Sequence, residues 1–331
     1  MKKEKIKTLL LGLGRIASTL EKDKLRYHPC THAGVILGSA LKNRFDLKGI
    51  YDTNSKKIYQ FLYQWNIPKE GLVTNLSDII KSKFDLCVIA TNSESHYENI
   101  IFAIEAKIPN LLVEKPACLN LTEIKQLLEK KKQAKTRIWV NHERRYHPLY
   151  GYVKKIISEK KYGKLKTVKM NVFTSTKGKK KTLLHDGTHA LDYIQWVLGK
   201  PFNYYNRASS NPKEDRFLSL MEYPNDVFAF LEVGDSRNYF QFEIEFQTTQ
   251  ARFVLSNDGS KIFISQKSDL YEGFFSLKEI NLPVFSKSNL NPWINLYREI
   301  TDVIDEKSKI ITGPIEDSHD IFEMIETINL C

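Results

Sequence analysis

A segment near the start of the chain has the residues and spacing of a phosphate-binding loop. Gly12 and Gly14 follow the apolar run Ile6–Leu11, and Ala17 completes the pattern G-x-G-x-x-A. The first glycine permits a tight turn, the second lets the backbone approach a pyrophosphate, and a small third residue allows close packing of a helix on the strand. A helix beginning here would add a positive dipole end. The segment predicts a dinucleotide site followed directly by a helix, with a ligand-free glycine turn as the alternative.

An acidic residue for the ribose is expected about 20 residues after this loop, but the nearest candidate, Asp52, lies farther along. The charged stretch Glu21–Cys30 accounts for the extra sequence distance between the glycine loop and Asp52 if it is a loop insertion. Asp52 would accept hydrogen bonds from ribose hydroxyls and repel a 2′-phosphate, which favours NAD. Lys56 and Lys57 follow closely and would instead accommodate that phosphate, so NADP is the alternative.

The elements that position these residues alternate regularly through the first 142 residues. Short aliphatic runs without polar alternation are typical of parallel strands buried on both faces. Amphipathic segments separate them, including a helix opened by Ser95 and Glu98 as a capping box and a second helix over Asn120–Lys132. This alternation predicts a doubly wound parallel sheet. The predicted strands are Ile6–Leu11, Leu47–Tyr51, Leu86–Ala90, Leu111–Val113 and Ile138–Val140.

After about residue 150 the pattern changes to short strands separated by turn signals, which predicts an open, mainly antiparallel sheet. Helices are expected over Leu183–Leu198, Pro292–Asp305 and His319–Leu330. We therefore expect a Rossmann domain over residues 1–142 and an α+β domain for substrate binding and oligomerisation over 143–331. The predicted strands are Lys164–Phe173, Phe217–Tyr223, Val227–Val233, Tyr239–Phe246, Arg252–Ser256 and Lys261–Ser265.

The composition of the chain limits the classes of protein to consider. The 331 residues are 42% hydrophobic and 27% charged, which excludes wholesale disorder and suits two domains. The net charge of +11 raises the question of nucleic acid, but no nucleic-acid-binding motif is present and the lysines are dispersed. The four cysteines lack metal or redox spacing, and no apolar run could span a membrane. We expect a cytoplasmic protein with no membrane or nucleic-acid partner and no metal.

Further motifs make the prediction specific. Residues 90–96 read Ala-Thr-Asn-Ser-Glu-Ser-His, residues 113–116 read Val-Glu-Lys-Pro, and residues 141–146 contain Asn followed by Arg-Arg-Tyr. Together with the glycine loop and a His- and Asp-rich helix start at 185–192, they resemble the Gfo/Idh/MocA family of dinucleotide-dependent oxidoreductases over nearly the whole chain. The resemblance implies hydride transfer between NAD(P) and an alcohol or ketone of a sugar, cyclitol or nucleotide-linked sugar.

The resemblance also implies a role for the Glu-Lys-Pro motif. A carbonyl that receives a hydride develops negative charge on oxygen, so a positioned cation or acid lowers the barrier. Lys115 would hydrogen-bond that oxygen, and Glu114 would line the cofactor or hold the lysine. His96 is equally well explained as the first residue of a helix. The cofactor-binding residues implied are Gly12, Leu13, Gly14, Arg15, Ile16, Asp52, Thr91, Asn92, His96, Glu114 and Lys115.

The second half of the implied site departs from the family pattern D-x-G-x-H-x-x-D. His189 matches the general acid/base and Asp192 the last position, but His185 occupies the place of the first Asp, and the carboxylate has moved to Asp186. One residue turns a helix by about 100°. Either His185 has taken over the substrate contact or the local turn is remodelled, so both His185 and Asp186 stay among the candidate catalytic residues.

Two further expectations concern partners. The lysine-rich stretch 177–181 is either a solvated loop or an electropositive segment that attracts an anionic substrate. One face of the second sheet is expected to be the contact surface between copies of the chain in a homodimer or homotetramer. Since a non-catalytic dinucleotide or sugar sensor would not need Lys115 or His189, their presence favours an enzyme, with the sensor as the alternative.

Overall fold

The computed structural model describes residues 4–41, 43–174, 181–211, 213–235 and 237–330. Contacts between Cα atoms divide the chain into two compact units, and each is described by itself. The first unit comprises residues 1–147 and 286–319, and the second comprises residues 148–285 and 320–331. The expected division after residue 142 differs from this arrangement, because residues 286–319 return to the first unit.

The first unit contains a five-stranded sheet in the order β2-β1-β3-β4-β5, and every paired strand in it is parallel. The order reverses between β1 and β3, which is the point where ligands bind in open α/β sheets. β1 and β3–β5 are almost fully buried, as the uninterrupted apolar runs predict. The strands are β1 (Ile6–Leu11), β2 (Phe45–Tyr51), β3 (Leu86–Ile89), β4 (Asn110–Val113) and β5 (Arg137–Val140).

Helices join these strands, and asparagines begin several of them. The side chains of Asn54, Asn75 and Asn120 each accept a backbone N–H in the first turn of their helix. The predicted capping box at Ser95 is wrong, because Ser95 Oγ donates to Asn92 and makes no cap hydrogen bond. The helices are α1 (His32–Leu37), α2 (Ser55–Trp65), α3 (Leu76–Lys81), α4 (His96–Glu105) and α5 (Leu121–Ala134).

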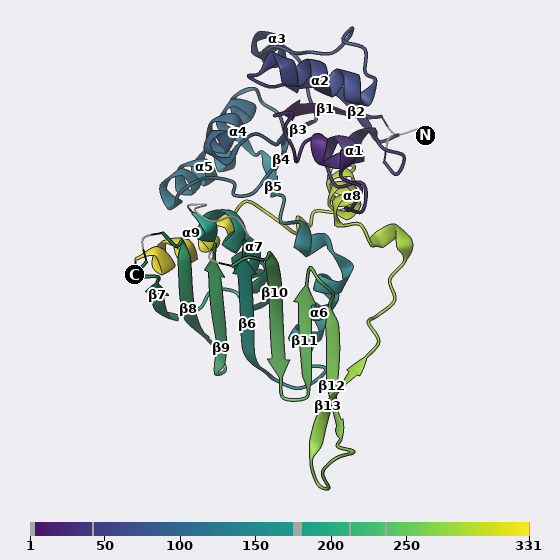
Figure 1. Cartoon of the computed structure of the whole chain (residues 1–331). Coiled ribbons are helices and arrows are strands. Elements are labelled where there is room, and N and C mark those ends of the chain that lie inside the picture. The colour runs from purple at the N-terminus through teal and green to yellow at the C-terminus, as the bar shows by residue number, and fades with distance from the viewer. Residues whose placement is uncertain (1–3, 42, 175–180, 212, 236, 331) are drawn as a thin grey trace. The chain divides into compact units, whose positions relative to one another are not determined.

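Helix α8 (Pro292–Ile304) belongs to the first unit although it lies more than 150 residues after β5 in the sequence. Trp293, Leu296, Tyr297 and Ile300 recur at helical spacing and are buried in the same core as β1 and α1. Figure 1 shows α8, in yellow-green, beside α1. The return of this helix supplies one wall of the core that the first 142 residues do not complete.

The second unit contains an eight-stranded sheet in the order β13-β12-β11-β10-β6-β9-β8-β7, drawn side by side in Figure 1. All its pairs are antiparallel except β6 with β9, so the sheet is mainly antiparallel as predicted. Strands β7 and β13 are not among the strands predicted from the sequence. The strands are β6 (Leu165–Phe173), β7 (Asn203–Ala208), β8 (Arg216–Tyr223), β9 (Val227–Gly234), β10 (Gln241–Thr248), β11 (Ala251–Ser256), β12 (Lys261–Lys267) and β13 (Phe275–Ile280).

The helices of the second unit bury apolar residues against this sheet. Tyr193 of α7 packs edge-on against Phe246 of β10, at 5.8 Å between ring centroids. A π-helical turn, Leu183–Gly187, directly precedes α7. The helices are α6 (Pro148–Ser158) and α7 (Thr188–Leu198), and the last, α9 (Asp317–Asn329), begins at the end of the first unit. Across the described ranges, no helix combines the length and apolar character needed to cross a membrane.

Candidate functional site

The glycine loop leaves β1 as a turn and not as the predicted α-helix. Thr19 N donates to Gly14 O and Leu20 N donates to Arg15 O, so these bonds span five residues, and a short 3₁₀ helix, Thr19–Lys22, follows. The loop insertion expected over 21–30 is present and separates this turn from α1. The helix prediction was wrong because Glu21 and its neighbours make contacts within that insertion instead of continuing the helix.

The two glycines of the loop have different steric surroundings. Gly12 has a φ of 84°, and a Cβ there would lie 2.6 Å from backbone atoms of Ala90 and Thr91. A Cβ on Gly14 would meet no atom within 4 Å. Gly12 is therefore required by the close approach of the β1 and β3 loops, whereas the space over Gly14 is open to a ligand. Arg15 is exposed and Ile16 is half-buried beside this space.

Asp52, at the end of β2, is tied to the glycine loop. Its Oδ2 accepts the backbone N–H of Leu13 at 2.9 Å, and its Oδ1 accepts that of Asn54 at 2.9 Å. Lys57 Nζ lies 3.6 Å from the same carboxylate, whose side chain is 7% exposed. The structure thus brings Asp52 and the loop together as the sequence pattern predicts, and adds a positioning role for the carboxylate.

The loops that follow β3 and β4 are joined by His96. Its Nδ1 lies 2.7 Å from the carbonyl oxygen of Pro116, and its Nε2 lies 3.1 Å from that of Thr91. The ring is 1% exposed and belongs to the first residue of α4. His96 therefore braces the two loops as a helix-start residue. Asn92 is exposed and accepts a hydrogen bond from the Ser95 hydroxyl.

Glu114 lies at the centre of a buried hydrogen-bond network. Its Oε1 accepts from Asn141 Nδ2 at 2.6 Å and from His32 Nε2 at 2.9 Å. The other ring nitrogen of His32 lies 2.8 Å from the Tyr297 hydroxyl. Since the carboxylate requires a donor, we assign the proton to Nε2 and the hydroxyl of Tyr297 as donor to Nδ1. Asn141 and His32, the latter held by Tyr297 of α8, thus orient the Glu114 carboxylate from segments far apart in the sequence.

The charge of this network follows from its contacts. Burial alone raises the pKa of Glu114, but the hydrogen bonds from His32 and Asn141 and the charge of Lys115 together lower it below its ordinary value. Burial, and then the Glu114 charge, raise the pKa of Tyr297 well above its ordinary value. At neutral pH the network therefore holds an ionised Glu114 beside a neutral phenol.

Lys115 follows this carboxylate directly in sequence and is half-buried, and its peptide bond to Pro116 is cis. His142 is buried nearby: burial, and then the charges of Arg145 and Lys115, lower its pKa well below the ordinary value. Lys115 is therefore flanked by a negative carboxylate and a neutral imidazole. This environment can hold an ammonium group at the carboxyl end of β4.

In the second unit, the predicted residues occupy the π-helical turn and the first turn of α7. His185 and Asp186 lie in the turn Leu183–Gly187, and His189 lies in α7, all three half-buried. The His189 ring packs edge-on against Phe242, at 6.2 Å between centroids. A π turn is wider than an α turn and is frequent at functional sites. His185 and Asp186 both belong to this π turn, so both stay candidates for substrate contact.

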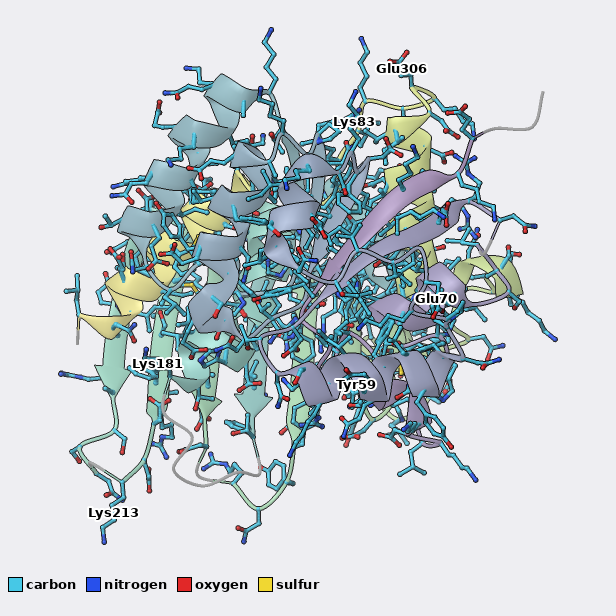
Figure 2. All side chains as sticks on the ribbon, turned by 90° about the horizontal axis from the view of Figure 1, so that it is seen from above. Tyr59, Glu70, Lys83, Lys181, Lys213 and Glu306 are labelled. Atoms are coloured by element: carbon cyan, nitrogen blue, oxygen red, sulfur yellow. The ribbon has the colours of Figure 1, made fainter. Side chains whose placement is uncertain are left out.

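Some expected features fall outside these sites. Lys177–Lys180 lie outside the described residues, and Lys181, labelled in Figure 2, is exposed with a φ of 66°. Within the described chain, Cys30, Cys87 and Cys118 are buried free thiols. Arg145 of the Arg-Arg-Tyr segment is buried against Asp317 and Thr312, which gives it a structural role.

Three residues near Glu114 and Lys115 escaped sequence reasoning. His32 was not predicted because it begins α1, which is only six residues long and too short to give a recognisable helical pattern after the insertion. Tyr297 looks like one more core residue of α8, and its hydroxyl partner lies 265 positions away. His142 adjoins Asn141, which the sequence motif did single out, but nothing in its spacing signals that it is buried beside Lys115.

Comparison with known proteins gives a family match over the first part of the chain. Residues 6–142 match the family described as "Oxidoreductase family, NAD-binding Rossmann fold" (Gfo/Idh/MocA). Over 159 residues the chain is 22% identical to inositol 2-dehydrogenase/D-chiro-inositol 3-dehydrogenase from Lactiplantibacillus plantarum, covering 46% of this chain and 45% of the enzyme. The chain matches less than half the length of the curated relatives.

Solved structures match nearly the whole length of the chain. The WlbA dehydrogenase from Bordetella pertussis, in complex with NADH and UDP-GlcNAcA, superposes with a TM-score of 0.76 at 16% identity, over 100% of this chain and 96% of that one. A super-repressor mutant of Gal80p from Saccharomyces cerevisiae gives 0.78 at 15% identity, over 99% and 95%. At these identities the likeness confirms the predicted fold class. With its parallel sheet and glycine turn, the segment 6–142 belongs to the Gfo/Idh/MocA family of oxidoreductases with an NAD-binding Rossmann fold.

Proposed function

We propose that the chain is an NAD(P)-dependent dehydrogenase or reductase that acts on a secondary alcohol or ketone of a sugar, cyclitol or nucleotide-linked sugar. The observation that carries this proposal is the open space over Gly14 in the glycine loop, which Asp52 anchors through the backbone N–H of Leu13. The named substrates of the inositol dehydrogenase and the ligands of WlbA support the substrate class.

The described residues fit a dinucleotide. The turn at Gly12–Gly14 would hold the pyrophosphate, Asp52 would accept from ribose hydroxyls, and Thr91, Asn92 and the Glu114–Lys115 loop would lie along the remaining part. The Asp52 carboxylate favours NAD over NADP, although Lys57 at 3.6 Å reduces its repulsion of a 2′-phosphate. When bound, the nicotinamide would supply or accept the hydride.

The proposal assigns the proton and charge movements to two side chains. In the oxidative direction, His189 removes the hydroxyl proton of the substrate and Lys115 stabilises the developing alkoxide. In reduction the same groups return the proton and polarise the carbonyl oxygen. Glu114 keeps its charge beside Lys115 through the His32 and Asn141 hydrogen bonds. His185 and Asp186 are assigned to substrate contact from the π turn.

The first test is dinucleotide binding by Gly14→Ala. Because the added Cβ meets no protein atom within 4 Å, the fold should tolerate it, and unfolding should shift by no more than about 0.5 kcal/mol. The methyl group would occupy space that the pyrophosphate needs, so the Kd for NAD should rise at least about tenfold, or about 1.4 kcal/mol. Calorimetric titration with NAD and NADP, together with thermal unfolding, measures both quantities.

Gly151→Ala in α6 provides a matched control, since its Cβ also meets no atom within 4 Å. It should leave NAD affinity unchanged. The dinucleotide site would be refuted if neither NAD nor NADP binds the folded wild-type chain, or if Gly14→Ala binds as tightly as wild type.

The second candidate function is a non-catalytic sensor of a dinucleotide or sugar. It is favoured by the displaced carboxylate at Asp186 and by the structural likeness to a super-repressor form of Gal80p. Turnover separates the two: an enzyme oxidises or reduces a member of a panel of sugars, cyclitols and nucleotide-linked sugars, whereas a sensor binds NAD without consuming any of them.

For assembly, we propose that the outer face of the eight-stranded sheet contacts a second copy of the chain. Tyr205, Leu220 and Phe230 lie opposite one another on β7, β8 and β9, while their sequence neighbours Met221 and Leu231 are buried. The same face carries Arg207, Glu232 and Lys169, so its polar groups have both signs, as a self-complementary surface requires. Tyr205 and Phe230 are 57% and 46% exposed.

Phe230→Glu should therefore convert a dimer or tetramer into smaller species, because it places a charge in the centre of an apolar contact. Sedimentation velocity at several concentrations measures the mass. Tyr59→Glu, on an exposed aromatic residue of α2 that Figure 2 labels, should leave the mass unchanged. A monomeric wild-type chain at high concentration would contradict the proposal.

A further inference from the structure

The insertion between the glycine turn and α1 brings together three side chains of metal-binding type. Glu21, His28 and Cys30 each present one ligand atom, and these atoms all lie within 4.8 Å of one another. His28 Nδ1 is 3.1 Å from Glu21 Oε1 and 3.8 Å from Cys30 Sγ. Zinc is bound in proteins by this mixture of carboxylate oxygen, imidazole nitrogen and thiolate sulfur.

The distances agree with a tetrahedral ion. Bonds of about 2.3 Å to sulfur and about 2.0–2.2 Å to nitrogen or oxygen separate the ligand atoms by roughly 3.3–3.6 Å. The two measured separations bracket this range, so small side-chain adjustments would be enough to complete the geometry. In the absence of an ion, the contact of His28 with Glu21 is an ordinary hydrogen bond. With an ion, the same two atoms become one edge of the coordination polyhedron.

The fold holds Glu21 in place for this role. Its second oxygen, Oε2, accepts from Thr31 Oγ1 at 2.7 Å and from the backbone N–H of Cys30 at 3.1 Å, which leaves Oε1 directed at His28. A Cβ on Gly34 would lie 2.4 Å from Oε2, so the carboxylate packs directly against this glycine of α1. Such outer hydrogen bonds orient metal-ligating carboxylates.

We infer that Glu21, His28 and Cys30 form a site for one zinc-type divalent cation per chain, with a water molecule as the fourth ligand. The His28 side chain is 39% exposed and that of Glu21 is 17% exposed, so solvent reaches the fourth position. On binding, the Cys30 S–H bond breaks, its proton passes to the buffer, and a sulfur–metal bond forms. The sequence spacing alone did not indicate this site, because the three residues are separated by a loop.

Cobalt(II), whose absorption spectrum reports on its ligands, tests the site in the 331-residue chain without an added histidine tag. Burial, and then the charge of Glu21, raise the pKa of Cys30 to about 11, so the thiol is protonated at neutral pH without a metal. We expect one Co²⁺ to bind per chain and to give a near-ultraviolet thiolate-to-cobalt band. Visible bands with the intensity typical of tetrahedral Co²⁺ should accompany it. Adding Zn²⁺ should displace the Co²⁺ and remove all of these bands.

Variants identify the ligands. Cys30→Ser should abolish the thiolate band, although Cys87, Cys118 and Cys331 remain. His28→Ala should weaken Co²⁺ and Zn²⁺ binding at least about tenfold. Asp23→Asn is the matched control: it removes a nearby carboxylate charge that lies outside the ligand set, and should preserve the band and the stoichiometry. The proposal is overturned if folded wild-type chain shows no thiolate band at saturating Co²⁺, or if the band persists in Cys30→Ser.

Discussion

Lys115→Ala is expected to lower kcat by about 10²–10⁴-fold on the substrate found in the panel, with little change in the Kd for NAD. The reason is that the lysine is assigned to a charge that develops only in the transition state. His189→Ala should reduce kcat by a comparable factor, because the proton then has no positioned acceptor. Steady-state kinetics measure kcat, and titration with NAD measures the Kd.

The double variant sharpens this prediction. If Lys115 and His189 serve the same step, their losses should be strongly non-additive, since removing either one already disables the pair. Lys125→Ala, at an exposed position on α5, is the control and should keep wild-type turnover. Wild-type kcat in both single variants would refute the catalytic assignment, while the dinucleotide site would stand.

His32→Leu is expected to reduce the free energy of unfolding by about 3–5 kcal/mol at neutral pH. The substitution leaves the buried, ionised Glu114 without one of its two side-chain donors, and such uncompensated buried charge is costly. Tyr297→Phe removes only the outer hydroxyl and should cost about 1 kcal/mol. Urea unfolding measures both, and equal losses in the two variants would contradict the network.

The same network predicts a pH dependence. The pKa of Glu114 is lowered in the folded chain, so the unfolded chain binds more protons between the two pKa values and stability rises with pH there. The contribution is complete above the ordinary pKa of 4.5 and is lost as pH falls through the lowered value. Glu114→Gln cannot titrate, so its stability should fall less steeply than that of wild type between pH 7 and pH 3.

Glu105→Gln controls for the general effect of removing a carboxylate, since the Glu105 side chain is 67% exposed in its ion pair with Lys130. Its pH profile should parallel that of wild type. Parallel profiles for Glu114→Gln and wild type would show that the buried carboxylate does not have the lowered pKa.

Much of the first unit could be predicted from the sequence because its signals are local. The five aliphatic runs predict the β1–β5 strands to within a few residues, and Gly12 and Gly14 predict the turn that follows β1. Parallel strands buried on both faces need continuous apolar residues, so these apolar runs predict a parallel sheet directly. The Glu114–Lys115 motif likewise marked the end of β4.

The errors lie in short segments whose pairing is not visible in the local sequence pattern. The helix expected after Gly14 became a wide turn because Glu21 is bound by Cys30 and Thr31. The capping box failed because Ser95 Oγ donates to Asn92. Strand β13 was missed because its residues, Phe275–Ile280, have no buried member and are paired only through β12.

The sequence by itself determined the parallel sheet, the mainly antiparallel sheet and the glycine turn after β1, because strand burial and turn conformation depend on neighbouring residues. Only the tertiary structure decided that α8 returns to the first unit and places Tyr297 on His32, and that Glu21, His28 and Cys30 converge. These contacts depend on how the chain is routed and on where a loop folds back. Residue spacing does not encode that routing, because the same local patterns are compatible with many arrangements of distant segments.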